Sequence, residues 1–304
     1  MPVSVRRART PAERARSLEI YNTVWPSEAV TPERVASWQA SLADHADFLA
    51  DVDGEDVGSA VAAVAPSRLS TCFALVTVLA ETRRRGAGGA LYAAVSEWAR
   101  ERDLSKIETR AAADDAASIE FGRRRGLEEH SRETGLELDL RTAAVPLLAP
   151  PDGIEITTLA ARPEAAAAVY GVSIEANPDV PGYADFVSPP LEAWLEHHLL
   201  DPQTPPDAIF LAVAGEEVVG YAKLRLDAQP GSATHAMTGV KRAWRGRGVA
   251  TALKSAQIAW AKERGLERLA TTNELRNAPM RRVNERLGYR PVPGRVHLRG
   301  PAAA

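Results

Sequence analysis

The chain has 304 residues, of which 45% are hydrophobic and 25% are charged, and its formal net charge is -3. This balance is typical of a globular protein with a core, and the absence of a basic excess argues against nucleic acid as a partner. Because Cys72 is the single cysteine, neither a disulfide framework nor a thiolate metal cluster is possible, and we expect no metal site. No apolar run approaches the roughly 18 residues that span a bilayer, so we expect a cytoplasmic protein with no membrane partner.

The first half of the chain predicts a succession of helices and strands. In chain order these are an alternating run over residues 3–8, helices over 11–24 and 32–45, strands over 47–52, 57–65 and 73–79, a helix after Gly88, a strand over 106–110, a short helix over 116–125 and a hairpin over 127–140. Thr31-Pro32 is a helix-start signal, and Thr134-Gly135 is the predicted turn of the hairpin.

The second half repeats this pattern at one constant offset. Arg83–Leu91 corresponds to Arg245–Leu253, which gives an offset of 245 minus 83, or 162 residues. The same offset aligns Trp98 with Trp260, Leu104 with Leu266, Thr109 with Thr271 and Gly126 with Gly288. About 80 residues align without a gap, and such a period indicates duplication of a whole structural unit.

The repeat predicts two domains joined by a proline-rich linker. Residues 142–153 contain Pro146, Pro150 and Pro151, so we predict domains over residues 1–141 and 154–304 with this linker between them. Because helices precede and interrupt mostly antiparallel strands, the predicted fold class is α/β (α+β), with a mixed, mostly antiparallel sheet flanked by helices in each domain. Fusion of two copies can replace a dimer, so a monomer and a homodimer both stay open.

An arginine- and glycine-rich turn follows a strand and opens a helix in each half, at Arg83–Gly88 and at Arg245–Ala250. A helix start presents unpaired N–H groups and the positive end of the helix dipole, and glycine lets the backbone approach a ligand closely. Arginine adds fork-shaped donors for phosphate. Neither the Walker nor the Rossmann pattern is present, so the turns predict a different kind of pyrophosphate or polyanion site.

The spacing of these turns resembles motif A of the GNAT acetyltransferase superfamily, in which Arg/Gln-x-x-Gly-x-Gly/Ala holds the pyrophosphate of acetyl-CoA. It occurs as Arg83-x-x-Gly86-x-Gly88 and as Arg245-x-x-Gly248-x-Ala250. Residues 277–289 resemble the next motif of the family, and the counterpart at 115–127 is more degraded. The resemblance covers nearly all of both halves and implies an acetyl-CoA-dependent N-acetyltransferase of the tandem, two-domain type.

The resemblance also implies which residues would bind the cofactor. The backbone near Val240 and Val78 would pair with the pantetheine arm, the turns would hold the pyrophosphate, and Asn277 would contact the cofactor or the acceptor. The implied cofactor residues are Val240, Arg245, Gly246, Arg247, Gly248, Val249, Ala250, Thr251 and Asn277 in the second half, and Val78, Arg83, Arg84, Arg85, Gly86, Ala87, Gly88 and Gly89 in the first. Whether the first half still binds acetyl-CoA stays open.

The candidate catalytic residues lie in the second half. Many members of the family carry a tyrosine four residues before the glycine of Leu-Gly-Phe, and this chain has Asn284 and Gly122 there. Asparagine can hydrogen-bond a thiolate and glycine cannot, so we predict that the second half is catalytic and the first degenerate. The strand before Val240 has no carboxylate, which leaves His235 as a candidate base and Thr238 as a residue that could orient water; both can equally be ordinary strand residues.

The predicted acceptor is the amine of a small molecule that attacks the acetyl group directly in a ternary complex. Glu175 and Asp179, in an acidic and proline-containing segment, could hold a cationic amine, although a solvated acidic loop explains them equally well. Two other functions stay open. One is a protein N-acetyltransferase, and the other is a non-catalytic acetyl-CoA-binding or structural protein, which the missing tyrosine and carboxylate favour.

Overall fold

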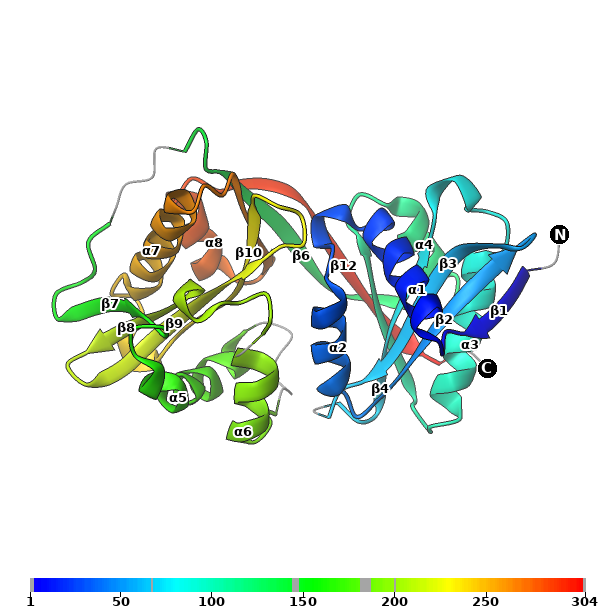
Figure 1. Ribbon diagram of the computed structural model, residues 1–304, viewed down its shortest axis with the longest axis horizontal. Coiled ribbons are helices and arrows are strands. Elements are labelled where there is room, and N and C mark those ends of the chain that lie inside the picture. Colours follow the sequence, from blue (N-terminus) through cyan, green and yellow to red (C-terminus); the bar gives the residue numbers. More distant parts are fainter. Residues whose placement is uncertain (1–2, 67, 144–147, 181–186, 200, 303–304) are drawn as a thin grey trace. The chain divides into compact units, whose positions relative to one another are not determined.

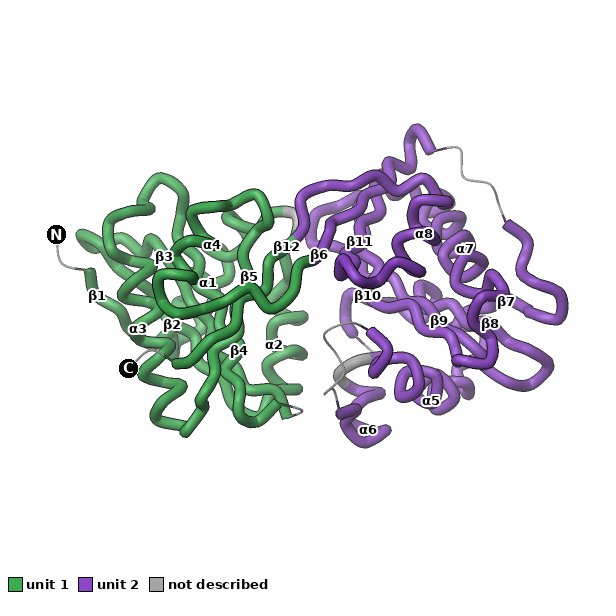
Figure 2. Tube along the Cα trace, turned by 180° about the vertical axis from the view of Figure 1, so that it is seen from behind, with its two compact units in different colours: residues 1–132, 295–304 green, residues 133–294 purple. Residues whose placement is uncertain are grey.

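The computed structural model describes residues 3–66, 68–143, 148–180, 187–199 and 201–302. The chain forms two compact units (Figure 2). Unit 1 contains residues 1–132 and 295–304, and unit 2 contains residues 133–294. The predicted domain limits follow the sequence repeat, whereas the compact units divide inside two strands, after Arg132 and after Gly294.

Unit 1 is a mixed sheet with helices on it (Figure 1). Its elements are β1 (Val3–Arg7), α1 (Pro11–Val24), α2 (Pro32–Ala40), β2 (Asp44–Val52), β3 (Glu55–Val64), β4 (Thr71–Val78), α3 (Ala87–Arg100), β5 (Lys106–Ala112), α4 (Ala116–Arg123) and the start of β6 (Glu128–Asp139). Strands β1 to β4 are antiparallel neighbours, and β5 runs parallel to β4. Thr10 caps α1 and Thr31 caps α2, each through its side-chain oxygen.

Unit 2 repeats this order. Its elements are β7 (Ile154–Thr158), α5 (Ala166–Ala176), α6 (Leu191–Trp194), β8 (Ile209–Ala214), β9 (Glu217–Leu226), β10 (Ser232–Val240), α7 (Val249–Glu263), β11 (Arg268–Glu274), α8 (Ala278–Arg286) and the start of β12 (Arg290–Pro301). Strands β7 to β10 are antiparallel neighbours, and β11 runs parallel to β10. The predicted fold class, a mixed and mostly antiparallel sheet flanked by helices in each copy, is confirmed.

Each unit takes its last strand from the other half of the sequence. Residues 295–301 of β12 pair with β5, and residues 133–139 of β6 pair with β11. The hairpin predicted over residues 127–140 is therefore wrong, because β6 runs as one strand from Glu128 to Asp139. Gly135 does not make a turn. A Cβ atom there would lie 2.6 Å from the carbonyl oxygen of Pro293, so glycine lets β6 and β12 approach closely.

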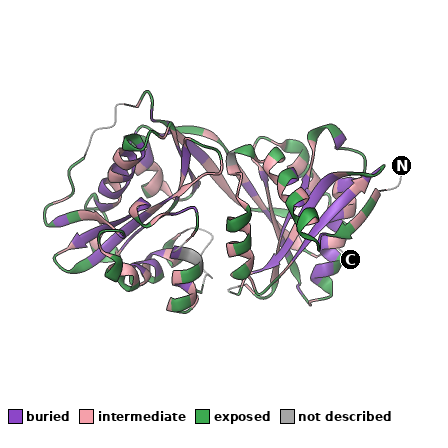
Figure 3. Ribbon diagram, viewed as in Figure 1, coloured by how far each residue is buried: buried purple, intermediate pink, exposed green. Residues whose placement is uncertain are grey.

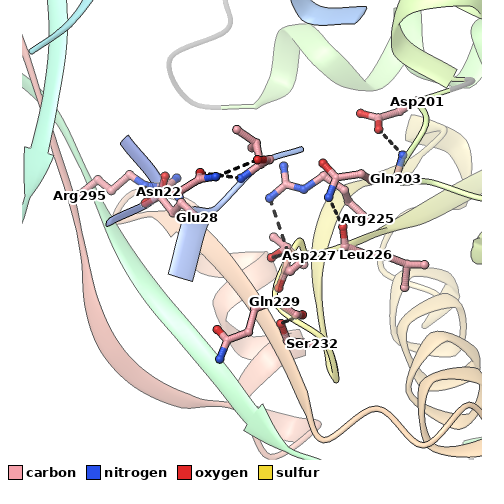
Figure 4. A network of polar contacts seen from close by, with 12 residues as sticks. Asn22, Glu28, Asp201, Gln203, Arg225, Leu226, Asp227, Gln229, Ser232 and Arg295 are labelled. Carbon is pink, nitrogen blue, oxygen red and sulfur yellow. Dashed lines mark hydrogen bonds and ion pairs between the residues drawn. The ribbon is translucent and has the colours of Figure 1, made fainter. Parts of the chain in front are cut away.

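Charged side chains hold the end of β12 within unit 1. Glu28 binds Arg295 Nε through one carboxylate oxygen (2.6 Å) and Arg110 Nη2 through the other (2.9 Å). Arg299 pairs with Glu108 of β5 (2.6 Å). Figure 4 shows Arg295 beside Glu28. Such charge-assisted pairs, partly buried, add specificity to a strand that arrives from far along the sequence.

The strands of unit 2 are largely buried (Figure 3). Apolar residues pack on both faces of its sheet. Ile209 and Leu211 of β8 pack with Val172 of α5, whereas Phe210 between them packs with Leu253 of α7. A strand that is buried on both faces has no polar alternation, which explains why β8 is apolar throughout. None of the described helices combines the length and apolar character needed to cross a membrane.

Candidate active site

In unit 2 the pairing between β10 and β11 stops early. Only residues 232–234 of β10 pair with β11, at residues 268–270, although both strands continue. The pairing of β10 with β9 shifts register between His235 and Met237 and then continues to Val240. Residues 235–240 therefore have a backbone edge outside the β10–β11 ladder, called here the open edge of β10. Unpaired N–H and C=O groups on such an edge can bind an extended amide-containing ligand.

The turn after β10 has the backbone of an anion site. Gly246 and Gly248 have φ values of +74° and +91°, a region that side chains disfavour. Gly248 caps α7, and the first helical donor is Ala252, whose N–H donates to the carbonyl of Gly248 (3.0 Å). The N–H groups of residues 249–251 thus lack helical acceptors and lie at the positive end of the helix dipole. The residues predicted to hold the pyrophosphate form one continuous turn.

Unit 1 contains the same construction. Residues 71–73 of β4 are its only ones paired with β5, and Gly86, with a φ of +96°, caps α3. In both units the loop arginine folds back on the preceding strand. Arg83 Nε donates to the carbonyl of Val78 (3.4 Å), and Arg245 Nε donates to that of Val240 (2.9 Å). The arginines of the two turns therefore stabilise the turn as well as adding charge.

The other arginines of the turns also have neighbours within their own unit. Arg85 pairs with Asp53 (3.0 Å), and the guanidinium of Arg247 lies over the ring of Trp244 (5.0 Å). Arg84 has a φ of +66°, which is uncommon for a residue with a side chain. Because these side chains have partners, the backbone of each turn is its principal candidate surface for an anion.

The acetyltransferase (GNAT) family model matches residues 14–127 and residues 176–289 of the chain, once in each half. These two matches cover more than half of the sequence. The chain belongs to the acetyltransferase (GNAT) family. It is an acyltransferase with two tandem GNAT domains, as the repeat and the motifs predict, and proteins of this family generally use acetyl-CoA.

Solved structures with a similar fold span nearly the whole chain. One is a GCN5-related N-acetyltransferase from Sphaerobacter thermophilus, with a TM-score of 0.76, 20% identity, and coverage of 99% of this chain and 96% of that one. Another is a tandem GNAT protein from the clavulanic acid biosynthesis pathway, with a TM-score of 0.80, 19% identity, and coverage of 100% and 99%.

A third similar structure is a glucosamine N-acetyltransferase region of a fungal multi-domain β-N-acetylglucosaminidase. It has a TM-score of 0.70 and 16% identity, and it covers 98% of this chain and 38% of that one. At these identities the similarity concerns the fold. Among curated proteins, none matches this chain.

His235, the candidate base, lies inside the second GNAT domain with both ring nitrogens engaged. Its Nδ1 is 2.9 Å from the carboxamide of Gln257 on α7, and its Nε2 contacts the hydroxyl of Tyr289. Burial and the nearby Lys254 ammonium lower the pKa of His235 well below its ordinary value. A buried imidazole whose two nitrogens are both hydrogen-bonded, and whose pKa is depressed, is a poor direct acceptor for a substrate proton. Thr238 lies on the open edge and is partly exposed.

The two asparagines of the second motif have different surroundings. Asn277 caps α8 by accepting the N–H of Met280 (3.3 Å), which makes it a structural residue of the helix start. Asn284 is fully buried, and its Nδ2 donates to Oδ1 of Asn273 on β11 (2.6 Å). The Oδ1 atom of Asn284 has no hydrogen-bond partner within the described residues. A buried acceptor without a partner is costly, so this position is a polar defect in the interior of unit 2.

The two acidic residues predicted to hold an amine contact arginines at or just before the turn after β10. Asp179 pairs with Arg242 (2.9 Å) and with Arg245 Nη1 (2.7 Å), and these guanidinium groups lower its pKa to about 2. Glu175 accepts the backbone N–H of Arg242 (2.5 Å). Both carboxylates thus have cationic or N–H partners within unit 2, and their role in holding an acceptor amine stays a prediction.

Sequence reasoning missed two residues that the structure brings to the start of the open edge. Lys254 of α7 is 1% exposed, and Tyr289 is 4% exposed beside His235. Burial lowers the pKa of Lys254 to about 7 and raises that of Tyr289 far above its ordinary value. A signal was available, because the repeat places Lys254 opposite Tyr92, a buried position of α3. A lysine at a buried helix position indicates a special environment.

Proposed function

We propose that unit 2 binds acetyl-CoA and transfers its acetyl group to the amine of a small molecule, by direct attack in a ternary complex. The observation that carries this proposal is a difference between the units in the packing at the start of α3 and of α7, the helices that follow the two turns. In unit 2 the turn at residues 245–251 and the open edge of β10 lie together. No atom lies within 4 Å of a Cβ added at Gly246, which corresponds to Arg84 of unit 1, so the turn is open at this position.

In unit 1 side chains of α4 pack against the turn at Gly88, the position that corresponds to Ala250 of unit 2. Phe121 of α4 lies 3.5 Å from the position of a Cβ atom on Gly88, and the guanidinium of Arg125 stacks on Phe121 at 3.5 Å. Arg83 also pairs with Asp115 at the start of α4 (3.3 Å). At the offset of 162 residues Phe121 corresponds to Val283, a smaller side chain that packs into the core of unit 2. Unit 1 therefore serves as the degenerate copy in this proposal.

The residues of unit 2 fit the cofactor. The free N–H groups of residues 249–251 suit a pyrophosphate, and the open edge of β10 suits an extended arm with amide groups. When bound, acetyl-CoA supplies the activated acetyl thioester. The protein contributes by holding both reactants together, an effect that can be worth about 7–11 kcal/mol.

The acceptor would approach from the α5 face of the sheet. Met237 of β10 packs with the cluster that includes Tyr221 and α5, and a Cβ atom on Gly239 would lie 3.1 Å from Ala176. A protein of similar fold is named a glucosamine N-acetyltransferase, and its named acceptor is a small amine. This supports small amines as the first acceptor class to test.

Two measurements test the proposed function. Acetyl-CoA should raise the melting temperature of the protein, because a ligand that binds only the folded state stabilises it. Release of free thiol should then depend on an added amine, measured over a panel of amino sugars, amino-acid derivatives and short peptides. No thermal shift at saturating acetyl-CoA would contradict cofactor binding. Binding without turnover on any amine would favour a non-catalytic protein, and turnover on peptides alone would favour a protein acetyltransferase.

A further inference from the structure

Unit 2 contains a buried polar cluster formed by Lys254, His235, Tyr289 and Gln257. The carboxamide of Gln257 faces the backbone N–H groups of Lys223 and Leu224 (3.3 Å each), so its oxygen accepts from them and its nitrogen donates to His235 Nδ1 (2.9 Å). Neutral His235 then carries its proton on Nε2 and donates it to the hydroxyl of Tyr289. The hydroxyl hydrogen of Tyr289 finds no acceptor among the described residues.

Lys254 completes this cluster from α7. Its amine lies over the ring of Tyr289, 5.5 Å from the ring centre. No carboxylate among the described residues pairs with this amine, and Lys254 is only 1% exposed. An unpaired amine in the interior is expensive, because the charged form loses its hydration and gains no counter-ion.

The fold itself does not require these polar groups. At the offset of 162 residues, His235, Lys254, Gln257 and Tyr289 correspond to Phe73, Tyr92, Val95 and Leu127. Unit 1 forms the same strands and helices with those mainly apolar residues, and Tyr92, Val95 and Leu127 are buried there. The cluster is therefore a feature of unit 2 that its architecture alone does not explain.

The place of the cluster connects it with the reaction. His235 is the first residue of β10 beyond the three that pair with β11, so the cluster begins where the open edge begins. Beside it, the Oδ1 atom of Asn284 on α8 is fully buried without a hydrogen-bond partner among the described residues, and the carbonyl of Asn284 accepts the backbone N–H of Tyr289 (3.1 Å). Asn284 itself stands where a family tyrosine could donate a proton, and it cannot replace that function.

We propose that Lys254 is a positioning and proton-holding residue for acetyl transfer in unit 2, acting through the Tyr289–His235 pair. This inference rests on the proposed function. An acceptor ammonium loses two protons as its nitrogen bonds to the acetyl carbon and the carbon–sulfur bond breaks. The sulfur takes the bond's electron pair and one proton, and the neutral amine of Lys254 holds the other before solvent receives it.

The protonation of Lys254 is suited to this role. Burial lowers its pKa to about 7, so both forms are populated at neutral pH, which is where a proton-exchanging group works best. Among the described residues, the titratable groups beside Lys254 are His235 of β10 and Tyr289, which directly precedes β12. Neither carries a negative charge near neutral pH, since the pKa of His235 is depressed and that of Tyr289 is raised.

The substitution Lys254→Met separates a functional role from a structural one. Methionine has a similar length and no charge, so the variant should melt at the same or a higher temperature, as replacement of a buried charge by an apolar group often gives. Its kcat should nevertheless fall by about 100-fold, the usual range for a proton-transfer group, with the KM for acetyl-CoA unchanged. Tyr92→Met, at the equivalent position of unit 1, is the matched control and should keep the wild-type kcat.

A pH series and a second variant complete the experiment. The ratio of wild-type to Lys254→Met kcat should rise with pH between 6 and 9 as Lys254 loses its proton, and Tyr289→Phe should remove most of that rise. A constant ratio, or wild-type kcat in Lys254→Met, would overturn the inference while leaving the proposed function intact. Absence of turnover by the wild-type protein would instead contradict the proposed function.

Discussion

The two units have the same order of helices and strands, but different side chains pack at the turns before α3 and α7. In each, an arginine of the turn binds the last carbonyl of the preceding strand. In unit 1 that arginine, Arg83, also pairs with Asp115 of α4, whereas in unit 2 Arg245 pairs with Asp179 after α5. The acidic partner therefore follows the turn in the sequence of unit 1 and precedes it in the sequence of unit 2. Duplication kept the anion turn and changed which neighbouring element is tied to it.

The interiors differ in the same direction. Where unit 2 has His235, Lys254 and Tyr289, unit 1 has Phe73, Tyr92 and Leu127, and neither a lysine nor a histidine stands at these positions. Buried polar groups lower stability unless they are fully paired, and they are concentrated at functional sites. The comparison teaches that conservation of a turn between two copies does not by itself identify the working copy. The neighbouring helix and the polarity of the interior are the differences that favour unit 2 in the proposed function.

The largest expected effect comes from a bulky residue in the turn of unit 2. Gly248→Val places a side chain at a φ of +91° and disturbs the start of α7, so kcat/KM should fall by about 100-fold or more. Gly86→Val, at a φ of +96° in unit 1, imposes the same strain on the other copy and should retain activity. Steady-state kinetics with melting curves for both variants make the comparison, and equal losses would show that unit 1 also works.

A smaller effect should appear in the pH dependence of stability. The pKa of Lys254 is lowered to about 7 in the folded state, so between this pH and its ordinary pKa the unfolded chain holds a proton that the folded chain lacks. Lys254 should therefore make the free energy of unfolding rise by up to about 1.4 kcal/mol per pH unit in this range. This contribution of Lys254 to stability is lost as the pH falls toward 7.

Urea denaturation at pH 7, 8 and 9 measures this slope. Lys254→Met should show a flatter dependence than the wild-type protein, and Tyr92→Met should follow the wild-type slope. Parallel curves for Lys254→Met and wild type would mean that Lys254 does not change its protonation over this range.

The smallest predicted effect concerns the carboxylates at the two turns. Asp179 occupies donors of Arg242 and Arg245, so Asp179→Asn should remove a competing anion and tighten acetyl-CoA binding by about two- to fivefold, the range of an exposed ion pair. Asp115→Asn, which keeps a good helix cap in unit 1, should leave the affinity unchanged. Calorimetric titration compares the two variants, and weaker binding by Asp179→Asn would show that Asp179 supports the turn.

The duplicated turns could be predicted because their cause is local. A helix start needs glycine at positive φ, and the glycines that meet this need, Gly86 and Gly248, occupy equivalent positions in the repeat. The strand exchange could not be predicted, because the residues of β6 that pair with β11 lie more than 120 positions from it. Gly135 indicated a turn from sequence, but the close passage of β12 is what requires it. The limits of the compact units depend on that passage.

The candidate site was predicted in part for the same reason. The backbone of the turn follows from sequence spacing, whereas the partners of long side chains depend on which elements pack together. The contact of Asp179 with Arg245 and the position of His235 inside the core beside Lys254 could therefore not be predicted. Only the repeat offers a sequence signal for such residues, because its alignment shows where a charged side chain in one copy corresponds to a buried position in the other.

A structure determined with bound acetyl-CoA tests the central claim most directly, since it shows which copy holds the cofactor. The account predicts that the pyrophosphate binds the backbone of residues 245–251, with the rest of the cofactor extending along the open edge of β10. Acetyl-CoA bound only at residues 83–89 of unit 1, with the turn of unit 2 still occupied by Asp179 alone, would contradict it.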